Sequence, residues 1–108
     1  MSQDYYYKGY HIRVNAVPRE QFIYGGFGWA YQVLRKKKLC LRMVIKGQGI
    51  LNTEKDQVQI REKGLHQIYN FIDHQENVLC KQIQEYCFMI QNDMSIIPIE
   101  CKDFMISR

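Results

Sequence analysis

Hydrophobic and polar residues alternate along three segments in the first half of the chain. Apolar side chains occupy the even positions of residues 10–16, a second alternating segment runs from Trp29 to Arg35, and a third covers residues 39–46. A period of two places successive side chains on opposite faces of a β-strand. The short basic segment between the last two patterns is typical of a hairpin turn, so the three strands are predicted to form an antiparallel meander.

The second half of the chain follows helical spacing instead. Thr53 with Asp56 three residues later indicates a helix start, because a threonine hydroxyl accepts hydrogen bonds from the first turn. The apolar stripe that follows runs to Ile72, and Gly64 inside it permits a close approach to the sheet. After a polar break at residues 73–77, a second helix is predicted.

These elements predict an α+β fold. We expect a three-stranded antiparallel meander followed by two helices packed on one face, with a candidate edge strand near the C-terminus. A chain of 108 residues has room for a single domain, 1–108. Within it, the meander occupies residues 5–52, the helical part 53–92 and a C-terminal tail 93–108.

A resemblance to a known group rests on three features of the sequence. Residues 7–12 read Tyr-Lys-Gly-Tyr-His-Ile, Trp29 opens the second predicted strand, and the first helix ends near residues 71–73. In these features residues 5–73 resemble short bacterial β-β-β-α domains of unassigned function. The resemblance implies the fold of that part and no particular activity, and residues 74–108 depart from it by adding a helix and a tail.

The sequence also predicts a location and a redox state. No stretch approaches the ~20 apolar residues of a membrane-spanning helix, and the N-terminus lacks the basic and apolar regions of a secretory signal. A cytoplasmic location is therefore expected. In that compartment the cysteines are predicted to be reduced thiols that pack as small hydrophobic residues. They are Cys40, Cys80, Cys87 and Cys101.

No pattern in the sequence predicts catalysis or a bound cofactor. The cysteines form no Cys-x-x-Cys pair, and the three histidines are not spaced to complete a zinc site. Residues 47–52 begin like a dinucleotide-binding turn, but Asn52 replaces the third glycine and no βαβ unit surrounds it. No nucleophile, base or pair of carboxylates converges. We expect a protein that is not an enzyme and that needs neither metal nor cofactor.

Charge is distributed unequally along the chain. Residues 1–52 carry nine Lys and Arg against two acidic residues, a net charge of +7, whereas residues 53–108 carry −3. The basic strands and their hairpin are candidates for binding nucleic acid or another anion, because phosphates release counterions when they meet such a surface. The candidate contacts are Arg13, Arg35, Lys36, Lys37, Lys38, Arg42 and Lys46.

Aromatic and Met side chains suggest a different role, in protein–protein contacts. The candidate interface residues are Phe22, Tyr24, Phe27, Tyr86, Phe88 and Met89. Residues 86–90 are all apolar and would point all round a helix, so one sheet cannot cover them. We therefore expect a binding module that acts through protein contacts, including a homodimer centred on Phe88 and Met89. A tail folded back over this helix, and a nucleic-acid-binding hairpin, are the alternatives.

Overall fold

The computed structural model describes residues 2–22, 26–48, 51, 53–75 and 81–103. Within them the chain forms a six-stranded sheet and one long α-helix. The elements, in chain order, are β1 (Gln3–Tyr7), β2 (Tyr10–Val17), β3 (Phe27–Arg35), β4 (Lys38–Gly47), α1 (Glu54–Gln75), β5 (Gln84–Ile90) and β6 (Ile96–Ile99). Two short 3-10 turns, η1 (Arg19–Gln21) and η2 (Cys101–Asp103), follow β2 and β6.

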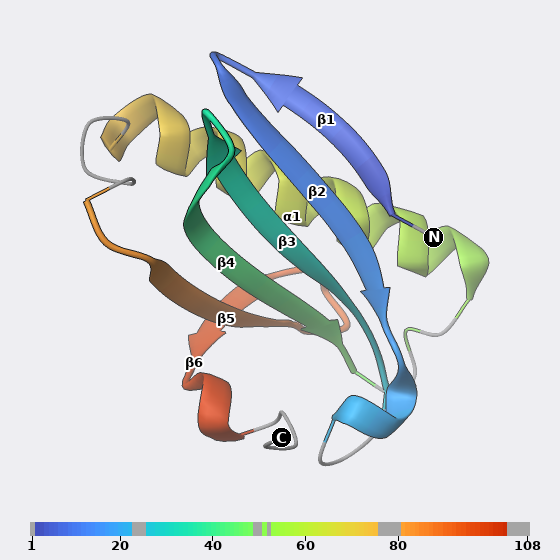
Figure 1. Ribbon diagram of the computed structural model, residues 1–108. Helices are drawn as coiled ribbons and strands as arrows, with labels where there is room; N and C mark the ends of the chain where they lie inside the picture. Colours follow the sequence, from blue (N-terminus) through green and yellow to red (C-terminus); the bar gives the residue numbers. More distant parts are fainter. Residues whose placement is uncertain (1, 23–25, 49–50, 52, 76–80, 104–108) are drawn as a thin grey trace.

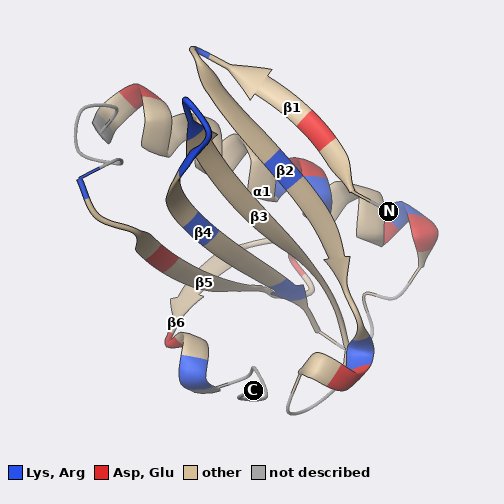
Figure 2. Ribbon diagram, in the orientation of Figure 1, with Lys and Arg blue, Asp and Glu red and all other residues tan. Residues whose placement is uncertain are grey.

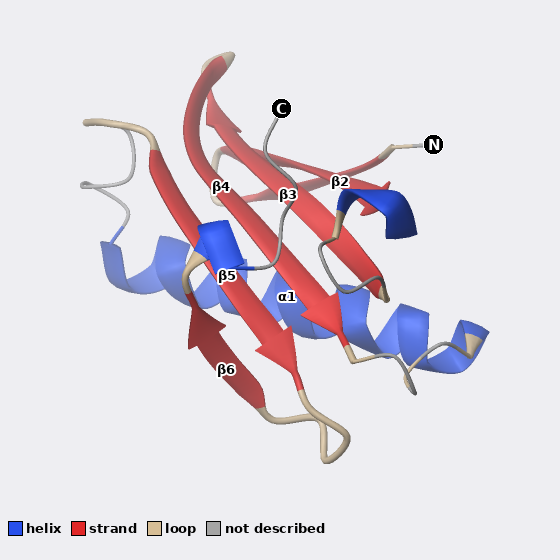
Figure 3. Cartoon of the chain, turned by 90° about the horizontal axis from the view of Figure 1, so that it is seen from below, coloured by secondary structure: helices blue, strands red, loops and turns tan. Residues whose placement is uncertain are grey.

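The strands lie in the sheet in the order in which they occur in the chain (Figure 1). Every neighbouring pair is antiparallel except β4 and β5, which run parallel. Parallel neighbours need a crossover connection, and α1 provides it by packing across one face of the sheet. Figure 3 shows α1 on that face and η1 and η2 on the other.

The core lies between α1 and the sheet. Alternate residues of the strands face the helix, which is the pattern that the sequence predicted for β2, β3 and β4. The side of the sheet turned away from α1 is called the open face below. The largest fully buried side chains are Tyr10, Tyr31, Ile12, Leu41, Met43, Ile45, Ile60, Ile68, Ile72 and Ile90.

Local details of α1 confirm two predictions. The Asp56 backbone N–H donates to Thr53 Oγ1 at 3.1 Å, and the Thr53 hydroxyl donates to the Asp56 carboxylate at 2.6 Å, which caps the helix start. Gly64 lies directly against the ring of Tyr31, where a Cβ atom would overlap the phenol. Trp29 also faces α1, and its indole N–H donates to the Gln57 carbonyl at 2.9 Å.

The predicted three-stranded meander followed by two helices is wrong. β1 adds a strand before the meander, and residues 84–90 form the parallel strand β5 rather than a second helix. Residues 78–80, where that helix was to begin, lie outside the described residues. The apolar run at residues 86–90 was interpreted as a helix, but a strand that is covered on both faces also carries apolar side chains on both faces. β6 does lie at the edge of the sheet, as expected for the tail.

This correction removes the basis of the predicted homodimer. Phe88 faces α1 within its own chain and is 7% exposed, so it belongs to the core. Met89 points the opposite way, as its neighbour in a strand must, and is half-buried. No apolar helix surface is left for a second copy to cover between residues 84 and 90.

Candidate nucleic-acid interface

The β1–β2 turn and the β3–β4 turn bring basic residues to one end of the molecule. β1 and β2 pair from Gln3 opposite Val14 to Tyr7 opposite Tyr10, so their turn holds Lys8 and Gly9. Both residues have positive φ angles, 48° and 82°. A two-residue hairpin turn of this kind requires positive φ at both positions, which glycine adopts readily.

The β3–β4 turn has the same geometry but contains no glycine. Arg35 pairs with Lys38, so Lys36 and Lys37 form the turn, with φ angles of 51° and 66°. For residues with a Cβ atom the left-handed region costs roughly 1–2 kcal/mol per residue. Two lysines therefore occupy the least favourable backbone positions of the hairpin.

The strand order places these turns side by side. β1–β2 and β3–β4 turn at the same end of the sheet, and β5, parallel to β4, begins at that end just after Lys81. Figure 2 shows the basic residues of the two turns together at this end and, apart from them, the basic segment that precedes β5. We call this cluster the basic end. It consists of Lys8, Arg35, Lys36, Lys37, Lys38 and Lys81.

Few acidic groups neutralise the basic end. Lys8 donates to the Asp73 carboxylate at 2.6 Å, and this hydrogen bond holds the pKa of the carboxyl below its ordinary value. Arg35 lies with its guanidinium 5.2 Å from the ring of Tyr10 and donates to its hydroxyl at 3.2 Å. Within the described residues, the three hairpin lysines and Lys81 enter no ion pair.

Strand register then defines two rows of side chains on the open face. The row next to the basic end, called the aromatic row, consists of Tyr6, His11, Leu34 and Leu39. The next row, called the charged row, consists of Asp4, Arg13, Gln32, Arg42 and Glu85. Cross-strand neighbours in such rows lie close enough to contact one another.

The aromatic row carries an exposed ring. The rings of Tyr6 and His11 stack with their centroids 4.8 Å apart and their planes 12° apart, and Tyr6 is 76% exposed. The imidazole Nε2 of His11 is hydrogen-bonded to the Asp4 carboxylate at 2.8 Å. That contact, with Arg13 Nε 3.6 Å away, holds the pKa of Asp4 below its ordinary value.

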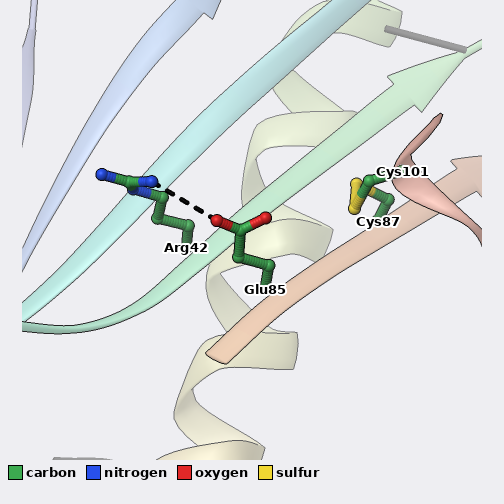
Figure 4. Close-up of a disulfide and its surroundings, with 4 residues drawn as sticks. All are labelled: Arg42, Glu85, Cys87 and Cys101. Carbon is green, nitrogen blue, oxygen red and sulfur yellow. Dashed lines mark hydrogen bonds and ion pairs between the residues drawn. A yellow bond between two sulfur atoms is a disulfide. The ribbon is translucent and has the colours of Figure 1, made fainter. Parts of the chain in front are cut away.

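The charged row is internally paired. Arg13 contacts Asp4, and the Arg42 guanidinium donates to the Glu85 carboxylate at 3.3 Å across the β4–β5 pair (Figure 4). Both arginines were candidate anion contacts, and both are exposed but balanced by a carboxylate. The open face is therefore close to neutral at this row, and the positive charge is concentrated at the basic end rather than spread over the sheet.

Lys46, the last of the candidate anion contacts, is not at the surface. It is 5% exposed and its ammonium lies 5.1 Å from the centroid of the Phe22 ring. Burial lowers the pKa of Lys46. This residue lies at the opposite end of the sheet from the hairpin and cannot share a ligand with it.

The described candidate protein-interface residues do not form one patch. Phe22 is buried against Val17 and Cys87, Tyr86 packs on Phe71, and Phe88 is in the core. Phe27 packs edge-to-face on Trp29, Met89 is half-buried beneath Gln48, and Tyr24 lies outside the described residues. These side chains serve several different contacts within the chain.

The prediction of reduced thiols is wrong for the described cysteines. Cys87 of β5 and Cys101 of η2 form a disulfide, with their Cα atoms 5.1 Å apart, and Cys40 is also disulfide-bonded. The β5–β6 hairpin brings Cys101 back over the open face beside Cys87, a proximity that sequence spacing does not reveal. The bridge borders a cleft of about 240 Å³ that Arg42 and Glu85 also line. Cys80 lies outside the described residues.

Three residues of this site were not identified from the sequence. Lys8 and Lys81 are far from the hairpin lysines in the chain, and Tyr6 precedes the first predicted strand. The Tyr-Lys-Gly-Tyr sequence at residues 7–10 was an available signal, because a two-residue turn with glycine between aromatic segments indicates a hairpin. It would have added β1 to the sheet.

Comparisons with known proteins identify no relative. No family model matches the chain, and neither a curated protein nor a solved structure matches it significantly. The resemblance of residues 5–73 to short bacterial domains therefore stays a prediction. Among the described residues, no group of three or more His, Cys, Asp or Glu side chains is arranged to hold a metal ion. None of their helices has the length and apolar character needed to cross a membrane.

Proposed function

We propose that this chain is a non-enzymatic binding module that holds the phosphate backbone of a nucleic acid at its basic end. The observation that supports this most is that three separate segments place cationic residues at one end of the sheet, where Lys8 is paired with Asp73 and the described residues give Lys36, Lys37, Lys38 and Lys81 no ion pair. Lysine ammonium groups on turns can follow an irregular phosphate chain, and counterion release makes each contact favourable.

The proposal favours the basic hairpin over the predicted self-association. That prediction rested on a helix at residues 78–90 whose second half is β5, with Phe88 in the core. Contacts with another protein stay a prediction, but the five candidate side chains that the structure describes give them no common surface. The absence of enzymatic activity also stays a prediction.

The cytoplasmic location stays a prediction, and the reduced thiols expected from it are not found. Disulfides persist in oxidising compartments and are rare in the cytosol, so the bridges favour an oxidising compartment instead. Counting free thiols in protein alkylated at the moment of extraction from its native host tests the location. Fully blocked thiols before reduction indicate an oxidising compartment, and four reactive thiols indicate the cytosol.

Salt dependence tests the phosphate contacts. Each phosphate contributes a slope of about −0.7 for single strands and about −0.9 for duplexes in log affinity against log salt. For about five contacts the affinity then falls roughly a hundredfold or more between ~50 and ~200 mM salt. Fluorescence anisotropy with a labelled oligonucleotide of about 20 nucleotides measures the affinity at each salt concentration.

Two triple variants that remove the same charge test whether binding depends on the basic end. Replacing Lys36, Lys37 and Lys38 by Gln is expected to weaken binding and to reduce the salt slope by about 2 for a single strand and somewhat more for a duplex. Replacing three cationic residues elsewhere by Gln removes the same charge and is expected to change binding far less. These control residues are Arg19, Lys55 and Lys102. Equal losses in both variants, or no binding to any oligonucleotide at ~50 mM salt, refute the proposal.

A further inference from the structure

We infer that the aromatic row makes this surface selective for single-stranded nucleic acid, with Tyr6 stacking on an unpaired base. The inference rests on the proposed function, because phosphate contacts at the basic end bring the strand to the row. It adds a substrate class, which charge alone does not define.

Tyr6 is prepared for stacking before any ligand binds. Its ring packs on that of His11, nearly parallel to it, and most of its surface is exposed. His11 is in turn hydrogen-bonded to the Asp4 carboxylate. An exposed tyrosine normally samples several rotamers, and a stacked neighbour that is itself fixed reduces this freedom. Less conformational entropy is then lost when a base stacks on Tyr6.

The position of the row matches the geometry of a single strand. Tyr6 is one residue from Tyr7, where β1 ends, and the β1–β2 turn with Lys8 follows directly. A nucleotide whose phosphate contacts the basic end can therefore lay its base on the open face. Beyond Tyr6 and His11 the row continues across the sheet with half-buried Leu34 and Leu39, an apolar floor on which a flat base can lie.

The charged row limits where the phosphates run. Its two carboxylates, Asp4 and Glu85, balance its two arginines, so a phosphate chain that crossed the sheet at this level would gain none of the net attraction that the basic end offers. The backbone is thus directed along the hairpin turns, with its bases turned toward the aromatic row. This arrangement of a cationic track beside aromatic rings is the one that binds unpaired bases with little sequence preference.

A duplex cannot use the aromatic row. Its bases are stacked on each other and reach a protein only by their edges, through a groove that admits a helix or a two-stranded ribbon. α1 lies on the far side of the sheet from the aromatic row, and the strands that carry the row belong to a six-stranded sheet rather than to a free two-stranded ribbon. Duplex DNA is therefore expected to make only the phosphate contacts of the basic end.

Binding of a 12-nucleotide oligothymidylate and of a 12-base-pair duplex, each labelled and each at 50 mM salt, tests the inference. The wild-type protein is expected to bind the single strand more tightly. Tyr6→Ala is expected to lower affinity for the single strand about tenfold, from the energy of one stacked base, and to leave duplex affinity unchanged. Tyr6→Phe keeps the ring and is expected to bind as the wild type does.

Two controls and a comparison of variants distinguish a failure of the stacking inference from a failure of the phosphate proposal. Val58→Ala removes an exposed apolar side chain from α1 and is expected to leave both affinities unchanged. Trp29 fluorescence verifies that each variant is folded, since this indole lies against α1. If Lys36→Gln weakens both ligands while Tyr6→Ala changes the single-strand affinity less than twofold, the stacking inference fails and the phosphate proposal stands. Tighter binding of the duplex by the wild-type protein also overturns the inference, and binding of neither ligand overturns both.

Discussion

Replacing Gly64 by Ala tests the packing of α1 on the sheet, because two rules give opposite expectations. In an exposed helix interior, alanine is favoured over glycine by about 1 kcal/mol. In this chain the added Cβ would overlap the hydroxyl oxygen and Cζ of Tyr31 and would lie 2.7 Å from Cε1. Tyr31 is 1% exposed and cannot move away without displacing its neighbours in β2 and β4.

The magnitude follows from three contributions. Overpacking a core costs about 1–3 kcal/mol, and the upper end applies where the overlap is with a buried ring. Displacing Tyr31 also breaks the hydrogen bond that its hydroxyl donates to the Arg61 carbonyl at 2.9 Å, which contributes about 1 kcal/mol. The higher helix propensity of alanine offsets about 1 kcal/mol of this loss of stability. We expect Gly64→Ala to lower the free energy of unfolding by about 3 kcal/mol.

Urea denaturation followed by Trp29 fluorescence measures this loss. Asn70→Ala, at an exposed position of the same helix, is the control and is expected to be neutral or slightly stabilising. In a Tyr31→Phe background the hydroxyl is absent, so Gly64→Ala is expected to cost less, with the difference appearing as a coupling energy in a double-mutant cycle. A stability gain of about 1 kcal/mol for Gly64→Ala in the wild-type background would refute this account of the helix–sheet contact.

Three further predictions concern the turns and the ends of the sheet. Replacing Lys36 by Asn together with Lys37 by Gly is expected to raise the free energy of unfolding by about 1–2 kcal/mol in urea denaturation, because this pair adopts positive φ at lower cost. Removing the Cys87–Cys101 bridge, which closes a loop with a sequence separation of 14, by replacing both cysteines with Ala is expected to cost about 3 kcal/mol, seen as a lower melting temperature than that of the wild type without reductant. The Lys8 contact depresses the pKa of Asp73, so its stabilisation is present above pH ~4 and is lost as pH falls through the lowered pKa; Asp73→Asn should flatten that part of an acid titration of stability.

The parts of the fold that were predictable carry local signals. Residues 10–16, 29–35 and 39–46 alternate because one side of each strand faces α1, and the helix start is capped within a single turn by Thr53 and Asp56. The close approach at Gly64 was also predictable, because a glycine inside an apolar helical stripe usually has a packing reason. Each of these features leaves a signal in residues that are close together in the chain.

β5 was misread because its environment is not local. Phe88 and Ile90 face α1, while Cys87 on the opposite side is covered by η2 and by Phe22. Both faces are therefore apolar, and periodicity no longer distinguishes a strand from a buried helix segment. Strand pairing with β4 decides the conformation, and that pairing depends on a crossover of more than thirty residues.

The candidate site was half predictable for a related reason. The run from Arg35 to Lys38 marks a basic turn in the sequence itself. That Lys8 and Lys81 join it depends on the order of strands in the sheet, which no spacing along the chain encodes. Lys46 shows the opposite error, because alternation places it on the open face, where the loop carrying Phe22 covers it.

The β3–β4 turn is where charge and stability oppose each other most directly. A two-residue turn with both φ angles positive favours Asn-Gly, yet Lys36 and Lys37 occupy it. Backbone strain of this kind occurs where a side chain is needed for something other than folding. The turn of β1 and β2 makes the comparison internal, because there a glycine occupies the second position and Lys8, in the first, pairs with Asp73. The Asn-Gly variant should therefore fold more stably and bind an oligonucleotide less tightly, and a variant that gained on both counts would remove the reason for placing lysines in the turn.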